Sequence, residues 1–356
     1  GLQLSIRYGG AFNGGTGGND SLILQGDTGI AAVYTPDSTT NGNGVVAVDN
    51  GSTTTTVTFT GLEPLDFTGF TTVVLSLPLG DDLVTITNGF DDATGAIPAL
   101  VLSGTSGGVG FEAAHVFGNT TVVINTSLNT DGNDTITVTS ADNAHANTNV
   151  SIIIGTGTDA IDINGNITVT GTLSLSTSDT VTQTGNLSAA SLALLGTGSY
   201  TLTNAGNNVT TLAANTNAVS YRDTDSLIVG SVTTVTNRVA MVDVTTTTTG
   251  ITTSNDNVTV RTGTTLTIDE DISIGTGVLT LNAGGAVTQN ANDDILANGG
   301  GLELIGTGPY TLTNSGNDVN NFAVNTTEAV SFRDTDDLIV TTVGGTTGIM
   351  TTNDAV

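Results

Sequence analysis

Apolar residues recur along the chain in runs of four to seven residues that are bounded by Gly, Asn, Asp or Pro. Runs of this kind, rich in Val, Ile and Thr, are typical of β-strands joined by tight turns. Nothing has the pattern of a long helix, and the best helical candidate, Phe111–Phe117, is predicted to be a capping turn or the approach to a strand. In the first 149 residues the pattern predicts strands at Leu22–Leu24, Ile30–Tyr34, Val45–Val48, Thr55–Thr60, Val73–Leu77, Leu83–Thr87, Leu100–Leu102, Val122–Asn125 and Thr135–Thr139.

One long stretch in the second half of the chain occurs twice. Residues 196–216 and 306–326 are identical at 14 of 21 positions, and residues 218–229 and 329–340 are identical at 10 of 12. Self-similarity at a fixed period is the signature of stacked repeats, in which each unit buries its apolar face on the next. We therefore divide the chain into an N-terminal β-rich region with Gly, Asn and Asp turns (1–149), a first repeat copy (150–260) and an incomplete second copy (261–356).

The two copies differ in length at two places. Copy two has gained about four residues near Asp293 to Gly301 and has lost 13 between Val340 and Gly348. Insertions in stacked repeats fall in loops on one face of the stack. Both places are therefore predicted to be loops.

The strand pattern and the repeat together predict an all-β protein that is an elongated parallel β-solenoid. A coil of roughly 20 to 25 residues would climb about 4.8 Å, so that each repeat copy would hold about five coils. The alternative is a series of tandem β-sandwich domains, because short strands with regular turns are also typical of sandwiches. The chain has no Trp and only 9 Phe. This shortage of large residues for a thick core favours the solenoid.

The charge of the chain is one-sided, with 33 acidic residues against 5 basic ones and a net charge of −28. Nucleic acid is excluded as a partner, since that affinity comes from Lys and Arg that neutralise phosphates. The absence of Cys rules out disulfides and thiolate metal sites. No apolar run approaches the roughly 18 residues of a spanning helix, so we expect no membrane insertion. Divalent cations are the natural counter-ions for such an acidic chain.

Several turns place Gly and acidic residues directly before an apolar strand. They resemble the calcium-binding nonapeptide G-G-x-G-x-D-x-U-x, in which carboxylates from successive turns bridge a hard cation. This pattern makes Asp20, Asp82, Asp134 and Asp159 candidate calcium ligands, and calcium is the only cofactor we expect. The alternative is that these Asp residues satisfy their own backbone in turns.

The tetrapeptide RDTD occurs once in each copy, at Arg222–Asp225 and at Arg333–Asp336. One interpretation is a contact with a cation or a partner. The other is a solvated turn with a local Arg–Asp pair, which adds little stability.

Catalysis finds little support in the residue types present. His115 and His145 are the only histidines and belong to no recognisable nucleophile arrangement. We therefore expect no enzymatic activity. The least favoured reading is a β-helical enzyme that degrades polysaccharides with paired carboxylates.

Three segments of the N-terminal region, Val57–Phe70, Leu79–Gly89 and Asp131–Asn143, together with the doubled GTG-x-YTLTN and RDTD motifs, resemble large bacterial extracellular repeat proteins of the haemagglutinin-like and autotransporter-adhesin-like kind. The resemblance implies a right-handed parallel β-helix displayed outside the cell.

We therefore expect a non-enzymatic structural subunit of an extracellular fibre or surface layer. Its copies would form a homo-oligomer or polymer by head-to-tail stacking of solenoid ends, since open strand edges invite pairing. The alternative is an adhesin or glycan-binding stalk at the cell surface. That alternative requires exposed aromatic residues on one face, for which the sequence offers Tyr200, Tyr221, Tyr310 and Phe332.

Overall fold

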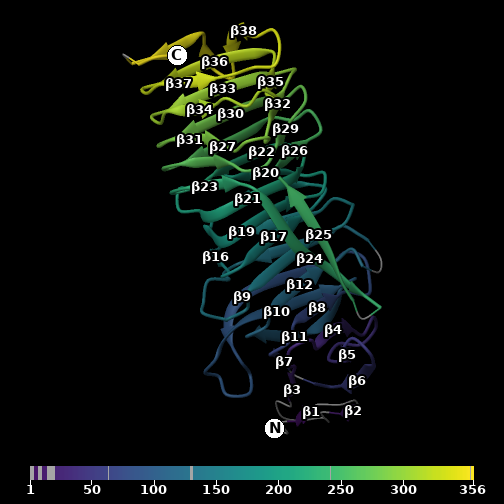
Figure 1. Cartoon of the computed structure of the whole chain (residues 1–356). Coiled ribbons are helices and arrows are strands. Elements are labelled where there is room, and N and C mark those ends of the chain that lie inside the picture. Colours follow the sequence, from purple (N-terminus) through teal and green to yellow (C-terminus); the bar gives the residue numbers. More distant parts are fainter. Residues whose placement is uncertain are drawn as a thin grey trace. The chain divides into compact units, whose positions relative to one another are not determined.

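The computed structural model describes residues 4–6, 10–13, 21–62, 64–128, 131–240, 242–352 and 354–356. Their regular structure is β-strand, and most strands pair in parallel from one coil to the next (Figure 1). The predicted fold class, an all-β parallel β-solenoid, is confirmed. The chain divides into two compact units, which are described in turn. Unit 1 comprises residues 1–179 and 234–246, and unit 2 comprises residues 180–233 and 247–356. None of the described residues forms a helix long and apolar enough to cross a membrane.

Unit 1 contains two sheets, called sheet A and sheet B. In pairing order, sheet A consists of β1 (Leu4–Ile6), β3 (Leu22–Gln25), β7 (Leu65–Thr68), β11 (Val109–Phe117), β10 (Pro98–Ser106), β9 (Leu83–Phe90), β13 (Thr135–Val138) and β15 (Ala160–Ile163). Sheet B consists of β2 (Gly10–Asn13), β6 (Thr54–Thr60), β5 (Gly44–Asp49), β4 (Ala31–Pro36), β8 (Thr72–Ser76), β12 (Thr121–Asn125), β14 (Asn149–Ile153) and β17 (Thr172–Ser176). The short strand β16 (Ile167–Thr168) precedes β17. Each strand predicted for the first 149 residues overlaps one of these strands.

Each sheet of unit 1 includes one antiparallel meander within an otherwise parallel stack. The meander of sheet B is β4–β5–β6, and that of sheet A is β9–β10–β11. The turn between β10 and β11 has left-handed backbone angles at Gly107 and Gly108 (φ 54° and 80°), a conformation that glycine adopts without strain in tight hairpins. Sequence pattern alone shows such strands but not their direction.

The prediction of a capping turn at Phe111–Phe117 is wrong, because these residues lie within β11. The pairing register of β11 with β10 shifts between Phe111 and Ala114. This β-bulge breaks the alternation of buried and exposed side chains by which a strand is recognised.

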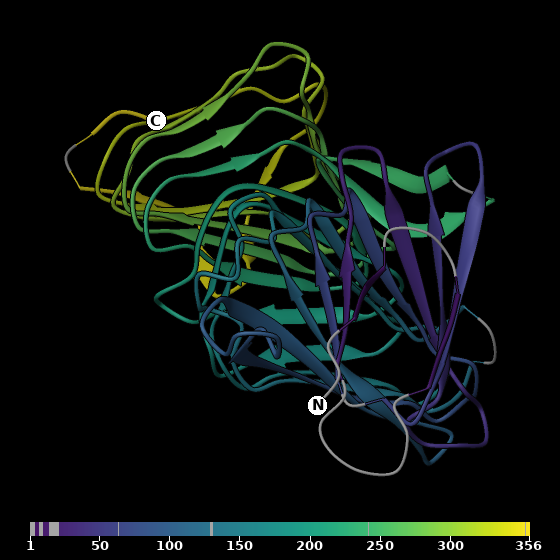
Figure 2. The same cartoon turned by 90° about the horizontal axis from the view of Figure 1, so that it is seen from below.

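Unit 2 stacks its strands in three columns, and Figure 2 shows its green-to-yellow coils nested behind one another. Column 1 holds β18 (Thr180–Gln183), β20 (Ser199–Leu202), β22 (Val219–Arg222), β27 (Val258–Thr262), β30 (Val278–Ala283), β33 (Gly301–Gly306), β36 (Asn321–Thr326), β38 (Ile339–Val340) and β41 (Ile349–Thr351). Column 2 holds β19 (Leu187–Leu195), β21 (Asn208–Thr216), β23 (Leu227–Val229), β28 (Leu266–Ile268), β31 (Val287–Gln289), β34 (Tyr310–Leu312) and β37 (Val330–Phe332). Column 3 holds β26 (Ile251–Thr253), β29 (Ile272–Ser273), β32 (Ile295–Ala297) and β35 (Asp318–Val319), and β26 pairs with the end of β21.

Side chains at the same place in successive coils of unit 2 form stacks in the core. Val260, Leu281, Leu304 and Val324 pair in register and are all buried. Burying each such side chain stabilises the folded chain by roughly 1.5–3 kcal/mol. The successive members are 21, 23 and 20 residues apart (260 to 281, 281 to 304 and 304 to 324), which agrees with the predicted coil length.

The two repeat copies occupy different columns. Tyr200 lies in column 1, whereas its equivalent Tyr310 lies in column 2, and Gln183 and Gln289 differ in the same way. From β20 to β34 the chain passes β22, β27, β30 and β33 of column 1. The repeat therefore spans four coils and part of a fifth, and not five whole coils. For this reason β31 and β34 of copy two lie one column further along than their equivalents in copy one, β18 and β20.

The two length differences between the copies have structural explanations. Leu187 and Ile295 are equivalent, because their N–H groups donate to the equivalent side chains of Asn207 and Asn317. Two of the extra residues of copy two therefore precede Ile295. The other two follow it, where copy two turns a corner between β32 and β33 and copy one has the single long strand β19. The 13-residue difference lies in a hairpin. Copy one has the long hairpin β24 (Ser231–Val239) and β25 (Val242–Thr249), and copy two has the short hairpin β39 (Thr342–Val343) and β40 (Thr346–Thr347).

The tip of the long hairpin, residues 234–246, belongs to unit 1. Arg238 donates to both carboxylate oxygens of Asp49, with Nε 2.8 Å from Oδ2, and its third nitrogen donates to Asp243. The Thr72 hydroxyl donates to Asp243 Oδ2 at 2.7 Å, and Val235 packs on a buried apolar cluster. Because the Arg238 and Asp49 side chains are both buried, this bidentate pair fixes the tip on sheet B.

Candidate functional site

Three of the four aspartates predicted as calcium ligands lie together in unit 1. Asp82, Asp134 and Asp159 immediately precede β9, β13 and β15, which pair side by side in register. The three side chains therefore stand on successive coils in one stack, which we call the Asp column. Asp20 lies outside the described residues.

Two carboxylates of the Asp column, those of Asp134 and Asp159, each bind the backbone of a neighbouring coil. Asp134 Oδ1 accepts a hydrogen bond from the Asp82 N–H at 2.8 Å, and Asp159 Oδ1 accepts one from the Asp134 N–H at 2.9 Å. Asp179 Oδ2 accepts from the Asp159 N–H at 2.9 Å and extends the column. These bonds tie coil to coil, so the expectation that each Asp satisfies its own turn does not describe them.

Asp179 was not among the predicted ligands. The sequence pattern that could have identified it is Asp, then any residue, then Val or Ile, at the start of a strand. The segments DLV, DTI, DAI and DTV, which begin at Asp82, Asp134, Asp159 and Asp179, all share it. The absence of a preceding Gly in the last segment explains why it was missed.

The Asp column is buried, and within the described part of the chain it forms no ion pair with a basic side chain. Asp82 and Asp134 are fully buried and Asp159 is nearly so. Among the described residues, both carboxylate oxygens of Asp82 and Oδ2 of Asp134 and Asp159 have no hydrogen-bond partner. An ionised carboxylate in such a place is costly. The column therefore needs a proton or a cation.

Burial is the main cause of the raised pKa values of Asp82 and Asp159. Burial, reinforced by the carboxylates of Asp134 and Asp81, raises the pKa of Asp82 to about 7, although the nearby Ser106 hydroxyl opposes the shift. Burial also raises the pKa of Asp159, and neighbouring acidic groups add to this. At neutral pH a proton accordingly occupies Asp82 in a large share of the molecules.

The geometry of the Asp column can be compared with the needs of calcium, which takes about six to eight oxygen ligands. Asp134 and Asp159 each commit one oxygen to a backbone N–H and leave one oxygen per coil. The part of the chain that the structure describes contains no group of three or more His, Asp or Glu side chains that could hold a metal ion. Calcium at the column stays a prediction.

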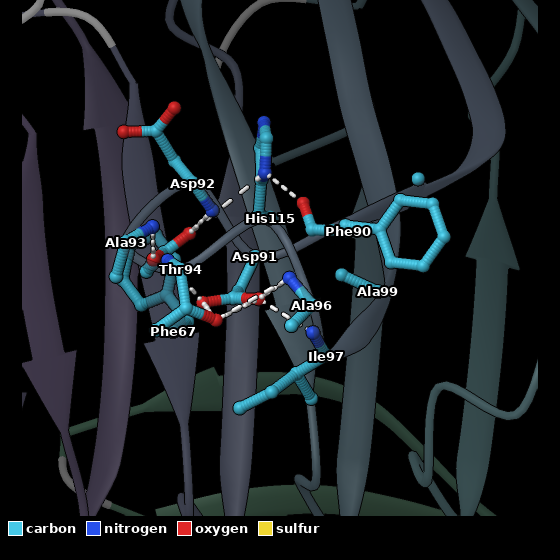
Figure 3. A network of polar contacts seen from close by, with 12 residues as sticks. Phe67, Phe90, Asp91, Asp92, Ala93, Thr94, Ala96, Ile97, Ala99 and His115 are labelled. Atoms are coloured by element: carbon cyan, nitrogen blue, oxygen red, sulfur yellow. Dashed lines mark hydrogen bonds and ion pairs between the residues drawn. The ribbon is translucent and has the colours of Figure 1, made fainter.

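A second buried acidic group, in unit 1, surrounds His115 (Figure 3). Asp66 is fully buried and accepts hydrogen bonds from the N–H groups of Asp92 and Ala93, both at 3.0 Å. The Nδ1 of His115 lies 3.8 Å from Asp66 Oδ1 and 2.6 Å from the Phe90 carbonyl oxygen. Burial raises the pKa of Asp66, which the two N–H donors oppose.

Asp91 organises the loop that follows β9, as Figure 3 also shows. Its carboxylate accepts the N–H groups of Thr94, Ala96 and Ile97 at 2.6 to 3.0 Å, and the Thr94 hydroxyl as well. Like the Asp66 carboxylate, the Asp91 carboxylate accepts hydrogen bonds from backbone N–H groups. These bonds fix the conformation of the loop. His115 contacts the carbonyl oxygen of Phe90, the last residue of β9, directly before the loop.

In unit 2 the buried side chain of Asn207, in the doubled motif, forms an amide pair with the half-buried side chain of Gln183. Asn207 Oδ1 accepts from Gln183 Nε2 at 2.8 Å and from the Leu187 N–H at 2.9 Å, and its Nδ2 donates to Gln183 Oε1 at 3.0 Å. Asn317 and Gln289 repeat the pair in copy two. The repeated residues thus join the strand ends of adjacent coils, which explains why they recur.

The RDTD motif also binds coils to each other. Asp223 is buried, and its carboxylate accepts from the Val209 N–H and from the Tyr221 hydroxyl, both at 2.9 Å. Asp334 holds the same place in copy two. The expected local Arg–Asp ion pair does not form in either motif among the described residues.

The aromatic residues considered for glycan binding are mostly unavailable. Tyr200, Tyr221 and Tyr310 are fully buried. The hydroxyls of Tyr200 and Tyr310 donate to the carbonyl oxygens of Leu195 and Ile305 at 2.7 and 2.6 Å. The expectation of an exposed aromatic face is therefore wrong for these three residues.

Comparisons of the chain with models of protein families, with curated proteins and with solved structures found no match. The function is accordingly inferred from the residues of the chain itself.

Proposed function

We propose that the chain is a non-enzymatic structural subunit of an extracellular fibre or surface layer, and that its copies associate end to end through the last coil of unit 2. A parallel solenoid supports this proposal, because every coil offers the next one a row of backbone groups and an apolar stripe. The carboxylates of Asp134 and Asp159 support a structural role as well, since they are buried and bind the backbone.

One difference between the repeat copies carries the proposal. Val229 and Ile251 of copy one are 0% exposed, because their strands pair with β28 and β29 of the next coil. Their equivalents Val340 and Ile349 are 50% and 39% exposed, and the adjacent Met350 is 60% exposed. The last coil thus presents an apolar face of the kind that another β-coil covers in copy one.

The occupant of this face, in the proposal, is a second copy of the chain. Among the described strands, β38 and β41 pair only with β36, and β1 pairs only with β3. All of these strands run in parallel within their stacks, so β1 of one molecule can extend the stack that ends in β38 and β41 of another. A contact between unlike surfaces does not close on itself and builds a filament.

Sedimentation velocity over a range of protein concentrations, with and without millimolar calcium, tests the proposal. We expect the wild-type chain to form growing assemblies and the double variant Val340→Lys/Ile349→Lys to stay monomeric, because charges on an open strand edge block pairing. The control Val242→Lys alters an apolar residue of the long hairpin that is 65% exposed, and it should assemble as the wild type does. A wild-type chain that stays monomeric under all conditions refutes end-to-end association.

A further inference from the structure

Two arginines stand side by side on adjacent coils of unit 2. Arg222 in β22 and Arg261 in β27 are register partners, and Asn282 in β30 is the next residue in the same row. Adjacent strands are about 4.8 Å apart, so the two guanidinium groups start from neighbouring positions. Arg261 is exposed and Arg222 is half-buried.

This pair of arginines lacks an acidic partner although the chain has 33 acidic residues. Among the described residues, neither Arg222 nor Arg261 forms an ion pair, whereas Arg238 binds two carboxylates. Like charges directly opposite each other on paired strands destabilise a sheet. An anion that binds both side chains would remove this repulsion.

The two arginines line one groove of about 300 Å³, which crosses several coils of column 1. Thr224, Asn282 and Thr307 add polar groups to its wall. Asp223 also lines the groove, but its carboxylate accepts hydrogen bonds from the Val209 N–H, the Tyr221 hydroxyl and the Asp225 N–H. That carboxylate is therefore already engaged within the fold.

We propose that this groove binds a phosphate or sulfate group between Arg222 and Arg261. Each guanidinium carries one positive charge and five N–H donors in a planar fork. Two of them match a group with a charge near −2 and three or more acceptor oxygens. A carboxylate would neutralise only one of the two. The proposal is independent of end-to-end association, because the residues that line the groove lie in or beside β22, β27, β30 and β33, and none of them belongs to β38 or β41.

Two sources of the oxoanion share the same chemistry: a free ion, and a group carried by a larger molecule such as a saccharide. The groove is open to solvent, so a carrier can extend from it. The net charge of −28 repels anions from the remainder of the surface. Binding at an exposed arginine pair is screened by salt, so it should weaken as the ionic strength rises.

Titration calorimetry of the full chain in a low-salt, phosphate-free buffer tests the proposal. The probes are inorganic phosphate, glucose 6-phosphate and, as a neutral control, glucose. We expect the wild type to bind phosphate, and Arg222→Gln and Arg261→Gln each to weaken that binding by about tenfold or more. Arg333→Gln is the matched control, because Arg333 has the same RDTD context but lies in a different groove together with Asp294. This variant should bind as the wild type does.

The outcomes separate the sources of the oxoanion. Binding of both phosphates but not glucose supports a site open to carried groups, and binding of inorganic phosphate alone supports a site for the free ion. Equal binding by the wild type and by Arg261→Gln overturns the proposal, as does absence of phosphate binding at millimolar concentration. Thermal unfolding adds a second measurement, since phosphate also stabilises proteins in general. Only the rise in Tm that is lost in Arg261→Gln counts in favour of the site.

Discussion

An aspartate at the start of a buried strand contributes a useful acceptor only if its charge is neutralised or shared. In the Asp column, Asp134 and Asp159 each accept one backbone N–H from the neighbouring coil. Asp82, at the end of the column, has no hydrogen-bond partner among the described residues for either carboxylate oxygen. Its neutral form is therefore favoured, in agreement with its pKa of about 7.

The raised pKa of Asp82 predicts a pH-dependent stability. The folded value of about 7 lies above the value of about 3.9 in an unfolded chain, so the folded state holds the proton more tightly. The stabilisation from this proton is complete below about pH 4 and is lost as the pH rises through 7. Asp82→Asn cannot ionise, so it should be more stable than the wild type at pH 8 by on the order of 1–3 kcal/mol. Urea unfolding at pH 5 and pH 8 measures the difference.

Two further results give this measurement its meaning. The control Asp162→Asn replaces an exposed carboxylate of β15 and should leave the pH dependence unchanged. If Asp82→Asn is instead less stable than the wild type at pH 8, the carboxylate is ionised and paired with a cation. That outcome would support the calcium prediction.

The amide pair of Asn207 and Gln183 predicts a loss of stability when Asn207 is truncated. Asn207→Ala leaves the buried Leu187 N–H without its acceptor and removes both bonds between Asn207 and the half-buried Gln183, whose Nε2 keeps the Gly185 carbonyl oxygen as acceptor. The loss should cost about 2–4 kcal/mol. Chemical denaturation measures it, with the exposed Asn215→Ala as a control expected to change stability by less than about 0.5 kcal/mol. A cost below about 1 kcal/mol for Asn207→Ala would show that water replaces the lost bonds.

At the scale of elements, the hydrophobic pattern located strands well, because each short apolar run ends at a turn residue. It did not determine their direction. The runs at β9, β10 and β13 look alike, yet β10 is antiparallel to β9 and β13 is parallel to it. The difference arises in the connections, since a short loop fixed by Asp91 returns the chain from β9 directly into β10.

The members of the candidate site could be predicted from the sequence, but their common stack could not, again because pairing between strands is not visible in the pattern. The motif identified Asp82, Asp134 and Asp159 one by one, because each follows a turn with Gly or Asn. Their common stack depends on the register between β9 and β13, which are separated in the chain by β10, β11 and β12. Burial of an Asp after such a turn could not be foreseen, since the same residues also occur in solvated turns.

The tip of the long hairpin predicts a localised effect of one substitution. Arg238→Met removes a buried side chain that binds Asp49 and Asp243 and leaves Asp49 buried with its largest partner missing. Breaking a buried ion pair in this way should cost about 3–5 kcal/mol. Hydrogen exchange of residues 234–246 should then become faster, whereas Val239→Thr at the exposed tip should not change it. Slow exchange at the tip in Arg238→Met would show that apolar packing of Val235 suffices to hold it.

At the scale of the whole molecule, the repeat and the charge act in opposite directions on assembly. The last coil exposes Val340, Ile349 and Met350, which favour contact with another copy. The net charge of −28 opposes any approach of two copies. At low salt this repulsion extends far, with a Debye length of about 30 Å at 0.01 M, whereas at 0.15 M it is about 8 Å.

Association of the copies is therefore predicted to strengthen with salt. We expect the mean mass from light scattering to rise as NaCl is increased from about 0.01 to 0.15 M, because screening removes repulsion while apolar contact is retained. The variant Val340→Lys/Ile349→Lys should remain monomeric over the whole range, which separates screening at this face from general salting-out. Assemblies that dissociate with salt would contradict the prediction, since they would require an interface held by ion pairs.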